Sequence, residues 1–384
     1  MLNKGMNCLW IVDSKIAVSE TFLLQSLSNH REIAEVFALS GAKKPHDALQ
    51  SVFYSGFAVE KRNFISRLAF RVFRFDFVEW SRKRRARKDL ELVVHERLFD
   101  YAWIHFGTTA PLVCMVLKSK KIPFFIQVHG ADVTARFNNC NYKKEFLLST
   151  ESSAGVVCNS EHIRRMLTLA GVKPDKIKIV NNALDMASFV PKDVSKSVNP
   201  SLVHFGRLTE KKHPIATLLA FQIVLESYPN ARLTFIGDGP LKSELESRIA
   251  SEELSESVVL LGALTREEAI PIVAEHWIFC QHSVTSSQGD QEGFPNSLAE
   301  AALLEMPVVS TFHNGIPENV IDGVTGFLVK EFDYEAMAER ILTLIASDEL
   351  RRSFGKNGRQ RIEDFCDPAK RVVKIRGLVE GYVN

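Results

Sequence analysis

Two glutamates eight residues apart, Glu292 and Glu300, flank a predicted loop-to-helix junction. Pro295 suits the start of a helix, where its missing N–H costs nothing, and Gly293 lets the backbone approach a ligand closely. The free amides and the dipole at a helix N-terminus attract phosphate, while carboxylates on either side accept hydrogen bonds from hydroxyl groups. The segment therefore predicts a sugar-nucleotide site, with Glu300 on the first turns of the helix. Taken alone, such a glutamate pair is more often a solvated surface.

A cluster of cationic residues follows a predicted strand at residues 201–205. Arg207 and Lys212 come directly after Gly206, at the carboxyl edge where open α/β sheets bind ligands. A guanidinium and an ammonium together suit a diphosphate leaving group, which gains negative charge when a glycosyl bond breaks. A solvated surface loop is the alternative for this motif alone. Because the cationic motif and the Glu292 junction occur in the same chain, the diphosphate site is favoured over a solvated loop.

These motifs resemble those of the family 4 glycosyltransferases, which are retaining enzymes of the two-domain GT-B class. The resemblance covers both halves of the chain and is closest to the branch that builds bacterial exopolysaccharides of the colanic-acid type. It is carried by the glutamate motif with its flanks, by a Gly-Arg-Leu-x-x-Lys-Lys motif and by three N-terminal motifs. These segments are 289–310, 206–212, 19–22, 104–109 and 128–132.

The resemblance implies a role for each matching residue. Glu292 would bind hydroxyls of the donor sugar, Glu300 the ribose, and Arg207 with Lys212 the diphosphate. The remaining donor-binding positions are Gly206, Gly293, Phe294, Pro295 and Asn296. The catalytic set is His129, Arg207, Lys212 and Glu292, and the residues facing the acceptor or the sugar are Ser19, Thr21, His105, His129 and Asp132. Without the resemblance, a histidine placed like His129 is more often a structural hydrogen-bonding residue.

The resemblance also implies a retaining reaction without a metal ion. The acceptor attacks the face from which the diphosphate leaves, and the leaving group itself takes the acceptor's proton. Arg207 and Lys212 replace the metal, and the chain lacks the Asp-x-Asp triplet that marks the other main glycosyltransferase fold. We therefore expect no cofactor and no metal site. The expected co-substrate is a nucleotide sugar, with a UDP-hexose such as UDP-glucose favoured by family frequency, and the expected acceptor is a saccharide or lipid-linked saccharide in exopolysaccharide synthesis.

Two other functions remain open at this stage. A sugar-nucleotide epimerase or a phosphorylase can be built on a similar pair of domains, because a fold does not settle function. A non-catalytic subunit of a carbohydrate-assembly complex is the third interpretation. The joint presence of Glu292, Glu300, Arg207 and Lys212 disfavours that subunit.

The elements that must position these residues follow a βαβ pattern. Short apolar runs alternate with polar turns and helical stretches, and 384 residues exceed what one compact core usually holds. The prediction is an α/β chain with two Rossmann-like, doubly wound domains facing across a cleft: an acceptor-binding domain at 1–190 and a nucleotide-sugar-binding domain at 191–367. By resemblance, the last helix at 368–384 crosses back to the first domain. Strands are predicted at 8–12, 35–39, 101–105, 124–128, 155–158, 177–180, 201–205, 232–236, 258–261, 277–280, 307–310 and 326–329.

Composition points to a cytoplasmic globular protein. The chain is 46% hydrophobic and 24% charged, with a net charge of +2, so no strong global field is expected. No segment offers the ~18 unbroken apolar residues of a membrane span. The six cysteines include no CxxC pair, which favours reduced, mostly packed thiols.

One segment departs from this balance. Residues 61–88 hold eleven Lys or Arg against two acids, a local charge of +9, with large apolar side chains interleaved. Such a pattern suits an interfacial helix on an anionic bilayer, which would place the protein at the inner face of the membrane. It equally suits a core face with a rim of solvated cations. Nucleic-acid binding is not predicted, because no recognised motif accompanies the charge.

Overall fold

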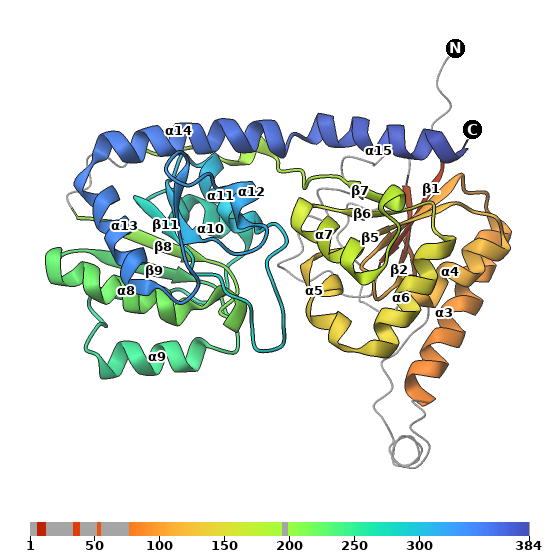
Figure 1. Ribbon diagram of the computed structural model, residues 1–384, viewed down its shortest axis with the longest axis horizontal. Helices are drawn as coiled ribbons and strands as arrows, with labels where there is room; N and C mark the ends of the chain where they lie inside the picture. The colour runs from red at the N-terminus through yellow and green to blue at the C-terminus, as the bar shows by residue number, and fades with distance from the viewer. Residues whose placement is uncertain (1–5, 13–33, 39–51, 55–76, 194–198, 384) are drawn as a thin grey trace. The chain divides into compact units, whose positions relative to one another are not determined.

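The computed structural model describes residues 6–12, 34–38, 52–54, 77–193 and 199–383 (Figure 1). They form two compact units. The first unit comprises residues 1–159, 164–180 and 371–384, and the second unit comprises residues 160–163 and 181–370. Residues 181–190, which sequence analysis assigned to the first domain, thus group with the second unit. Leu184 and Phe189 explain this, since both are buried in its hydrophobic core.

The first unit is a parallel sheet with strand order β3-β2-β1-β4-β5-β6-β7. Its strands are β1 (Cys8–Val12), β2 (Ala34–Ala38), β3 (Val52–Tyr54), β4 (Tyr101–His105), β5 (Phe124–Gln127), β6 (Gly155–Cys158) and β7 (Ile177–Ile179). Its helices are α3 (Phe77–Glu96), α4 (Ala110–Ser119), α5 (Gly130–Val133), α6 (Cys140–Ser152) and the greater part of α7 (Glu161–Ala170) and of α15 (Pro368–Val383). The parallel order requires crossover connections, and helices α3 to α7 lie in those that join β3 to β7.

Helix α15 closes one face of the first sheet. Ile375 and Val379 lie in one buried cluster with Trp10, Trp103 and Phe125 of the strands. The neighbouring strand residues point to the opposite face and are buried as well, as expected for a parallel sheet with helices on both sides. The chain therefore returns to its first unit at its last helix.

The second unit is a parallel sheet with strand order β10-β9-β8-β11-β12-β13. Its strands are β8 (Ser201–Phe205), β9 (Arg232–Ile236), β10 (Val258–Leu260), β11 (Ile278–Cys280), β12 (Val308–Thr311) and β13 (Gly326–Val329). Its helices are α8 (Pro214–Ser227), α9 (Lys242–Ser251), α10 (Arg266–Val273), α11 (Asn296–Leu303), α12 (Ile316–Asn319), α13 (Tyr334–Ala346) and α14 (Asp348–Phe365).

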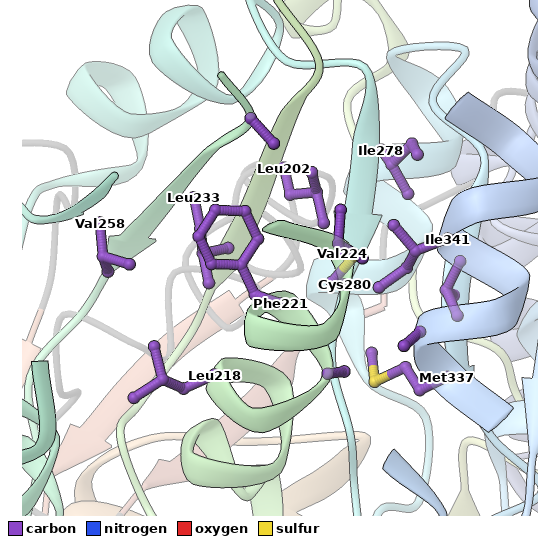
Figure 2. Close-up of a cluster of buried hydrophobic side chains, with 14 of the residues drawn as sticks. Leu202, Leu218, Phe221, Val224, Leu233, Val258, Ile278, Cys280, Met337 and Ile341 are labelled. Carbon is purple, nitrogen blue, oxygen red and sulfur yellow. The ribbon is translucent and has the colours of Figure 1, made fainter. Parts of the chain in front are cut away.

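Both faces of the second sheet carry a hydrophobic core. Figure 2 shows one of them, where Leu202 and Leu233 of the strands meet Phe221 of α8 and Ile341 of α13. The next residue of β8, Val203, belongs to the core on the opposite face, because side chains alternate along a strand. Two packed faces leave the carboxyl ends of the strands as the place for ligand-binding loops.

The predicted fold class is confirmed: each unit is a doubly wound parallel α/β sheet. All twelve predicted strands are present, with ends within one residue of the prediction; residue 39, the predicted end of the second strand, lies outside the described residues. The short strand β3 was not predicted. Five of the six cysteines are buried, and Cys140 is exposed.

The basic segment is only partly described. Residues 61–76 lie outside the described residues, and α3 is described with its side chains only from Arg84 onward. Ala86, Leu90 and Val94 are buried at helical spacing, whereas Arg84 and Arg85 are exposed. Among the described residues no helix has both the length and the apolar character that crossing a membrane requires.

Candidate functional site

The loops after β8 and β9 each begin with a glycine, and these two glycines are in close contact. Gly206 has φ 155° and Gly237 has φ 150°, a backbone region that favours glycine. A Cβ on Gly237 would lie 1.9 Å from the carbonyl oxygen of Gly206, so no other residue fits there without a shift. This contact lets the loop after β8 lie against the loop after β9. The loop continues as a 3₁₀ turn, Glu210–Lys212, that carries two lysines.

The two lysines converge on Glu292. The Lys212 Nζ lies 3.2 Å from Glu292 Oε1 and donates to Gln281 Oε1 at 3.0 Å. The Lys211 Nζ lies 3.1 Å from Asp290 Oδ2 and 4.0 Å from Glu292 Oε2. All of these side chains lie at the carboxyl edge of the second sheet. The cluster therefore joins the loop after β8 to the loop between β11 and α11.

The charges in this cluster are fixed by one another. Burial alone would raise the pKa of Glu292, but Lys212 and Lys211 outweigh it and lower the pKa to about 2. Burial alone would lower the pKa of Lys211, but Glu292 and Asp290 raise it. Glu292 is 6% exposed, so its carboxylate is an ionised hydrogen-bond acceptor in a nearly dry setting.

Glu300 lies on the second turn of α11, eight residues after Glu292, and is also buried. Its Oε1 is 3.1 Å from Nη2 of Arg266, whose guanidinium stacks over the Phe189 ring at 4.9 Å. Burial raises the pKa of Glu300, opposed by Arg266 and then by Lys212. The two cations thus limit the rise that burial causes in the pKa of Glu300.

Specific contacts hold the loop that leads from Glu292 into α11. Pro295 is the residue before the first helical residue, and its carbonyl accepts from the Asn319 side chain at 3.0 Å. The Asn296 Oδ1 accepts from Asn182 Nδ2 at 2.8 Å. The Phe294 ring is buried and stacks on Phe365, so its side chain serves the core. The N-terminal amides of an α-helix lack intrahelical partners, which leaves those of α11 as donors for an anion.

Arg207 differs from the two lysines. Its side chain is exposed, and no hydrogen bond or ion pair joins its guanidinium to the described part of the chain. It acts on Lys211 through its charge, which opposes protonation of that lysine. The structure thus brings Lys212 into contact with Glu292, places Gly206 beside the Lys212 side chain and leaves Arg207 at the rim of the same edge.

The predicted residues of the first unit gather after β4 and β5. The Asp132 Oδ2 accepts from the His129 backbone N–H at 2.9 Å, and the His129 ring lies 5.1 Å from that of Phe106. His105 is fully buried, with its ring 4.5 Å from the Trp10 ring, so it presents no surface to a ligand here. Ser19 and Thr21 lie outside the described residues.

Burial shifts the pKa of His129 and that of Asp132 in the direction that favours the uncharged form. Burial, followed by the charge of Arg371, lowers the pKa of His129 to about 4. Burial raises the pKa of Asp132 to about 6, opposed by backbone hydrogen bonds from His129 and Gly107. At neutral pH the His129 imidazole is therefore uncharged.

Sequence reasoning missed three members of the second unit's site. Lys211 stands in the same motif as Lys212, so its pairing could have been suspected. Gln281 directly follows β11, and the carboxyl end of a strand is a general signal for site residues. Arg266 had no such signal, since it lies in the capped first turn of α10 and meets Glu300 only through the fold. Among the described residues, no group of three or more His, Cys, Asp or Glu could hold a metal ion.

Two family models match the chain. Residues 35–188 match "Glycosyltransferase Family 4" and residues 189–361 match "Glycosyl transferases group 1". The amylovoran biosynthesis glycosyltransferase AmsK of Erwinia amylovora is 31% identical over 251 residues, covering 64% of this chain and 61% of AmsK. The putative colanic acid biosynthesis glycosyltransferase WcaL of Escherichia coli K12 is 31% identical over 270 residues, covering 68% of this chain and 66% of WcaL. The chain thus spans three fifths to two thirds of the length of these relatives.

The fold has a solved counterpart in HepE of Anabaena. The structure of HepE with UDP and glucose superposes with a TM-score of 0.79 at 18% identity, covering 97% of this chain and 98% of HepE. At that identity the likeness concerns the fold, which is the GT-B fold. Together with the matched models and the sequence relatives, it shows that the chain belongs to the family 4 glycosyltransferases.

Proposed function

We propose that this protein is a retaining, metal-independent hexosyltransferase of exopolysaccharide synthesis. It moves a hexose from a UDP-sugar, with UDP-glucose as the first candidate, to a saccharide or lipid-linked saccharide. The relatives named for amylovoran and colanic acid biosynthesis support the process, and HepE, solved with UDP and glucose, supports the donor. The sequence resemblance supports the retaining reaction and the absence of a metal.

The observation that carries the proposal is the buried, ionised Glu292 between Lys211 and Lys212 beside the N-terminus of α11. A carboxylate with a pKa near 2 is a poor proton acceptor but a strong acceptor of hydrogen bonds from sugar hydroxyls. Glu292 is therefore suited to holding the sugar rather than to removing a proton. The acceptor's proton then passes to the departing phosphate.

Stabilisation of the leaving diphosphate falls to three groups. Lys212 is held by Glu292 and Gln281, Arg207 extends from the rim, and the first turn of α11 presents amide donors. Fixed charges aimed at developing negative charge lower the barrier without reorganisation during the reaction. These groups supply that charge without a metal.

Glu300 and Arg266 suit the ribose of the nucleotide. The Arg266 guanidinium rests on Phe189 and holds one carboxylate oxygen of Glu300, which leaves the other for hydroxyl donors. In the first unit, the neutral His129 ring suits an uncharged saccharide. We assign Glu300 to the ribose and His129 to the sugar.

A binding and product assay tests this function. Thermal shifts with UDP-, GDP- and ADP-glucose should be largest for the UDP-sugar, since ligand binding to the folded state raises the melting temperature. NMR of the product from UDP-α-glucose should show an α-linkage, and EDTA should leave the rate unchanged. An inverted product, or loss of activity in EDTA restored by a divalent ion, would contradict the mechanism.

The alternatives give different outcomes in the same assay. An epimerase converts the UDP-sugar without any acceptor, and a phosphorylase consumes glycoside only with phosphate. A non-catalytic subunit would bind nucleotide sugar equally well after Glu292→Ala or Arg207→Ala. The proposal requires both variants to bind more weakly than the wild type.

We also propose that the basic segment 61–88 binds an anionic membrane surface from the cytoplasmic side. The exposed Arg84 and Arg85 on α3 support this, because each cation near an anionic bilayer contributes about 1 kcal/mol. Replacing both by Gln should weaken binding to phosphatidylglycerol vesicles at low salt, while Lys118→Gln with Lys120→Gln serves as a control of equal charge. Unchanged binding would favour the core-and-rim interpretation.

A further inference from the structure

His313 lies directly behind the Glu292 backbone. It follows β12, and its ring is fully buried. Its Nδ1 lies 2.7 Å from Glu331 Oε1, and its Nε2 accepts a hydrogen bond from the Glu292 backbone N–H at 3.1 Å. The Asn314 Nδ2 lies 3.1 Å from Nε2 and 3.2 Å from Nδ1, so it does not distinguish the two ring nitrogens. Neither His313 nor Glu331 belongs to the motifs that carried the donor-site prediction.

The Glu292 backbone N–H and the Glu331 carboxylate select one tautomer of His313. A backbone N–H can only donate, so Nε2 must be the unprotonated nitrogen. An ionised carboxylate can only accept, so Nδ1 must carry the proton that points to Glu331. Protonation or a tautomer exchange would place two N–H groups face to face at Glu292. The carboxylate of Glu331 therefore determines whether the Glu292 backbone has an acceptor.

Glu331 joins two loops. Its second oxygen, Oε2, accepts from the Thr285 backbone N–H at 2.9 Å. Thr285 lies in the loop that leads from β11 to Glu292, and His313 lies in the loop after β12. One carboxylate following β13 thus connects both loops that hold the donor-sugar carboxylate.

The Glu292 main chain is held from both ends. The Gly315 N–H donates to its carbonyl at 3.3 Å, while His313 holds its N–H. The two loops lie so close that a Cβ on Gly315 would come 1.7 Å from the Gly293 carbonyl oxygen. The backbone at Glu292 consequently has little freedom that is independent of His313.

We propose that His313 and Glu331 are a positioning pair for Glu292, with His313 held as the neutral Nδ1–H tautomer and Glu331 as the residue that maintains it. The proposal rests on the function proposed above, in which Glu292 binds the sugar of the donor. The pair thereby affects the binding energy that comes from the sugar of the donor. It leaves the binding energy of the nucleotide unchanged. A displacement of about 1 Å in such a group can cost about 10²-fold.

The first test replaces one atom of the pair. Glu331→Gln keeps the shape of the side chain, but its amide cannot accept from both His313 and Thr285. We expect the Kd of UDP-glucose, by calorimetry, to rise by about 10- to 100-fold, and that of UDP to stay within about twofold. Equal losses for both ligands, or no loss for either, would overturn the positioning role. If the wild type binds neither ligand, the proposed function fails instead.

The second test separates the two ring nitrogens. In His313→Gln, the Oε1 can take the place of Nε2 and accept from Glu292, whereas His313→Phe keeps a ring and offers no acceptor. The Gln variant should therefore retain more of the UDP-glucose affinity than the Phe variant. Equal behaviour of the two variants would contradict the proposed hydrogen bond.

His276→Gln is the matched control. The His276 ring is partly buried and, like that of His313, is hydrogen bonded at both nitrogens, to the Ile272 carbonyl and the Thr234 hydroxyl, each at 2.9 Å. Among the described residues, neither hydrogen-bond partner of His276 belongs to the Glu292 loop. We expect lower stability from this change and an unaltered ratio of UDP-glucose to UDP affinity.

The tautomer can be observed in the unmodified protein. Long-range ¹H–¹⁵N correlation spectra of ¹⁵N-histidine-labelled protein distinguish Nδ1–H from Nε2–H, and His313→Gln identifies the signal. We expect the Nδ1–H form at neutral pH. An Nε2–H form or an imidazolium would overturn the proposal even if every variant folded poorly.

Discussion

The carboxyl edges of the two sheets handle buried charge in opposite ways. In the second unit, Glu292 and Lys211 are pushed further into their ionised forms, because each is paired with an opposite charge. In the first unit, burial dominates, so the pKa of His129 falls to about 4 and that of Asp132 rises to about 6. The same topology thus yields one edge rich in fixed charge and one edge where charge is disfavoured.

This difference indicates which ligand each edge suits. A diphosphate needs fixed cations and amide donors, which the second unit provides. A neutral saccharide needs hydrogen-bonding groups that do not demand a counter-ion, and the uncharged His129 ring matches that requirement. Removing a cation from the second edge tests whether fixed charge serves the diphosphate. Varying the pH tests whether burial controls charge at the first edge.

The largest effect is expected from Arg207→Ala. Loss of one group that stabilises leaving-group charge typically costs about 3 kcal/mol, or ~10²-fold in kcat. Because the Arg207 side chain is exposed, its removal should leave the melting temperature nearly unchanged. Steady-state kinetics with UDP-glucose measures the effect, and Arg248→Ala, at a partly exposed arginine on α9, serves as the control. Normal turnover in Arg207→Ala would remove the diphosphate assignment.

A smaller loss is expected from Arg266→Gln. Burial, which raises the pKa of Glu300, is unchanged in this variant. The charge of Arg266, the larger of the two that lower this pKa, is lost. We expect UDP to bind about tenfold more weakly at pH 7, because a hydrogen bond to a charged group is worth about 1.5 kcal/mol or more. The affinity of the variant should improve as pH rises and Glu300 loses its proton, while Arg266→Lys should restore most of it. A variant with wild-type UDP affinity at every pH would contradict the ribose assignment.

The sequence predicted this architecture well because each strand is a short apolar run between turn residues. Such runs depend on local pattern, and buried parallel strands are nearly continuous in hydrophobicity. The three-residue strand β3 is too short for that signal. Phe189 lies in the stretch 181–190 that the sequence assigned to the first domain, and only the fold shows that it packs under Arg266 in a core of the second unit.

The site was predictable where one motif holds several of its members. Glu292, Glu300 and Lys212 lie in two short segments whose spacing suggests chemistry. Arg266, His313 and Glu331 come from separate connections, and each meets its partner only because parallel strands end at one edge. Pairings across such sequence distances leave no local pattern, so a single sequence does not reveal them.

The subtlest expected effect is a change in the pH dependence of stability upon Asp132→Asn. In the wild type, the raised pKa of Asp132 costs stability as pH increases from about 4 to 6, because the folded state binds the extra proton there. The lowered pKa of His129 has the opposite sign, adding stability between about 4 and 6.5, where the unfolded state binds more protons. The two contributions to the slope of unfolding free energy against pH therefore nearly cancel across this range. Removing Asp132 leaves the His129 slope, up to about 1.4 kcal/mol per pH unit.

Urea unfolding from pH 4 to 7 measures this change. Trp10 and Trp103 lie in the core of the first unit, so their fluorescence follows its transition. Asp132→Asn should grow more stable relative to the wild type as pH rises, whereas Asp175→Asn, an exposed carboxyl of the same unit, should follow the wild-type profile. A difference that is flat with pH would mean that Asp132 titrates as it does in the unfolded chain. In that case burial would not govern charge at the first edge, and the contrast between the two edges would reduce to the presence of lysines at one of them.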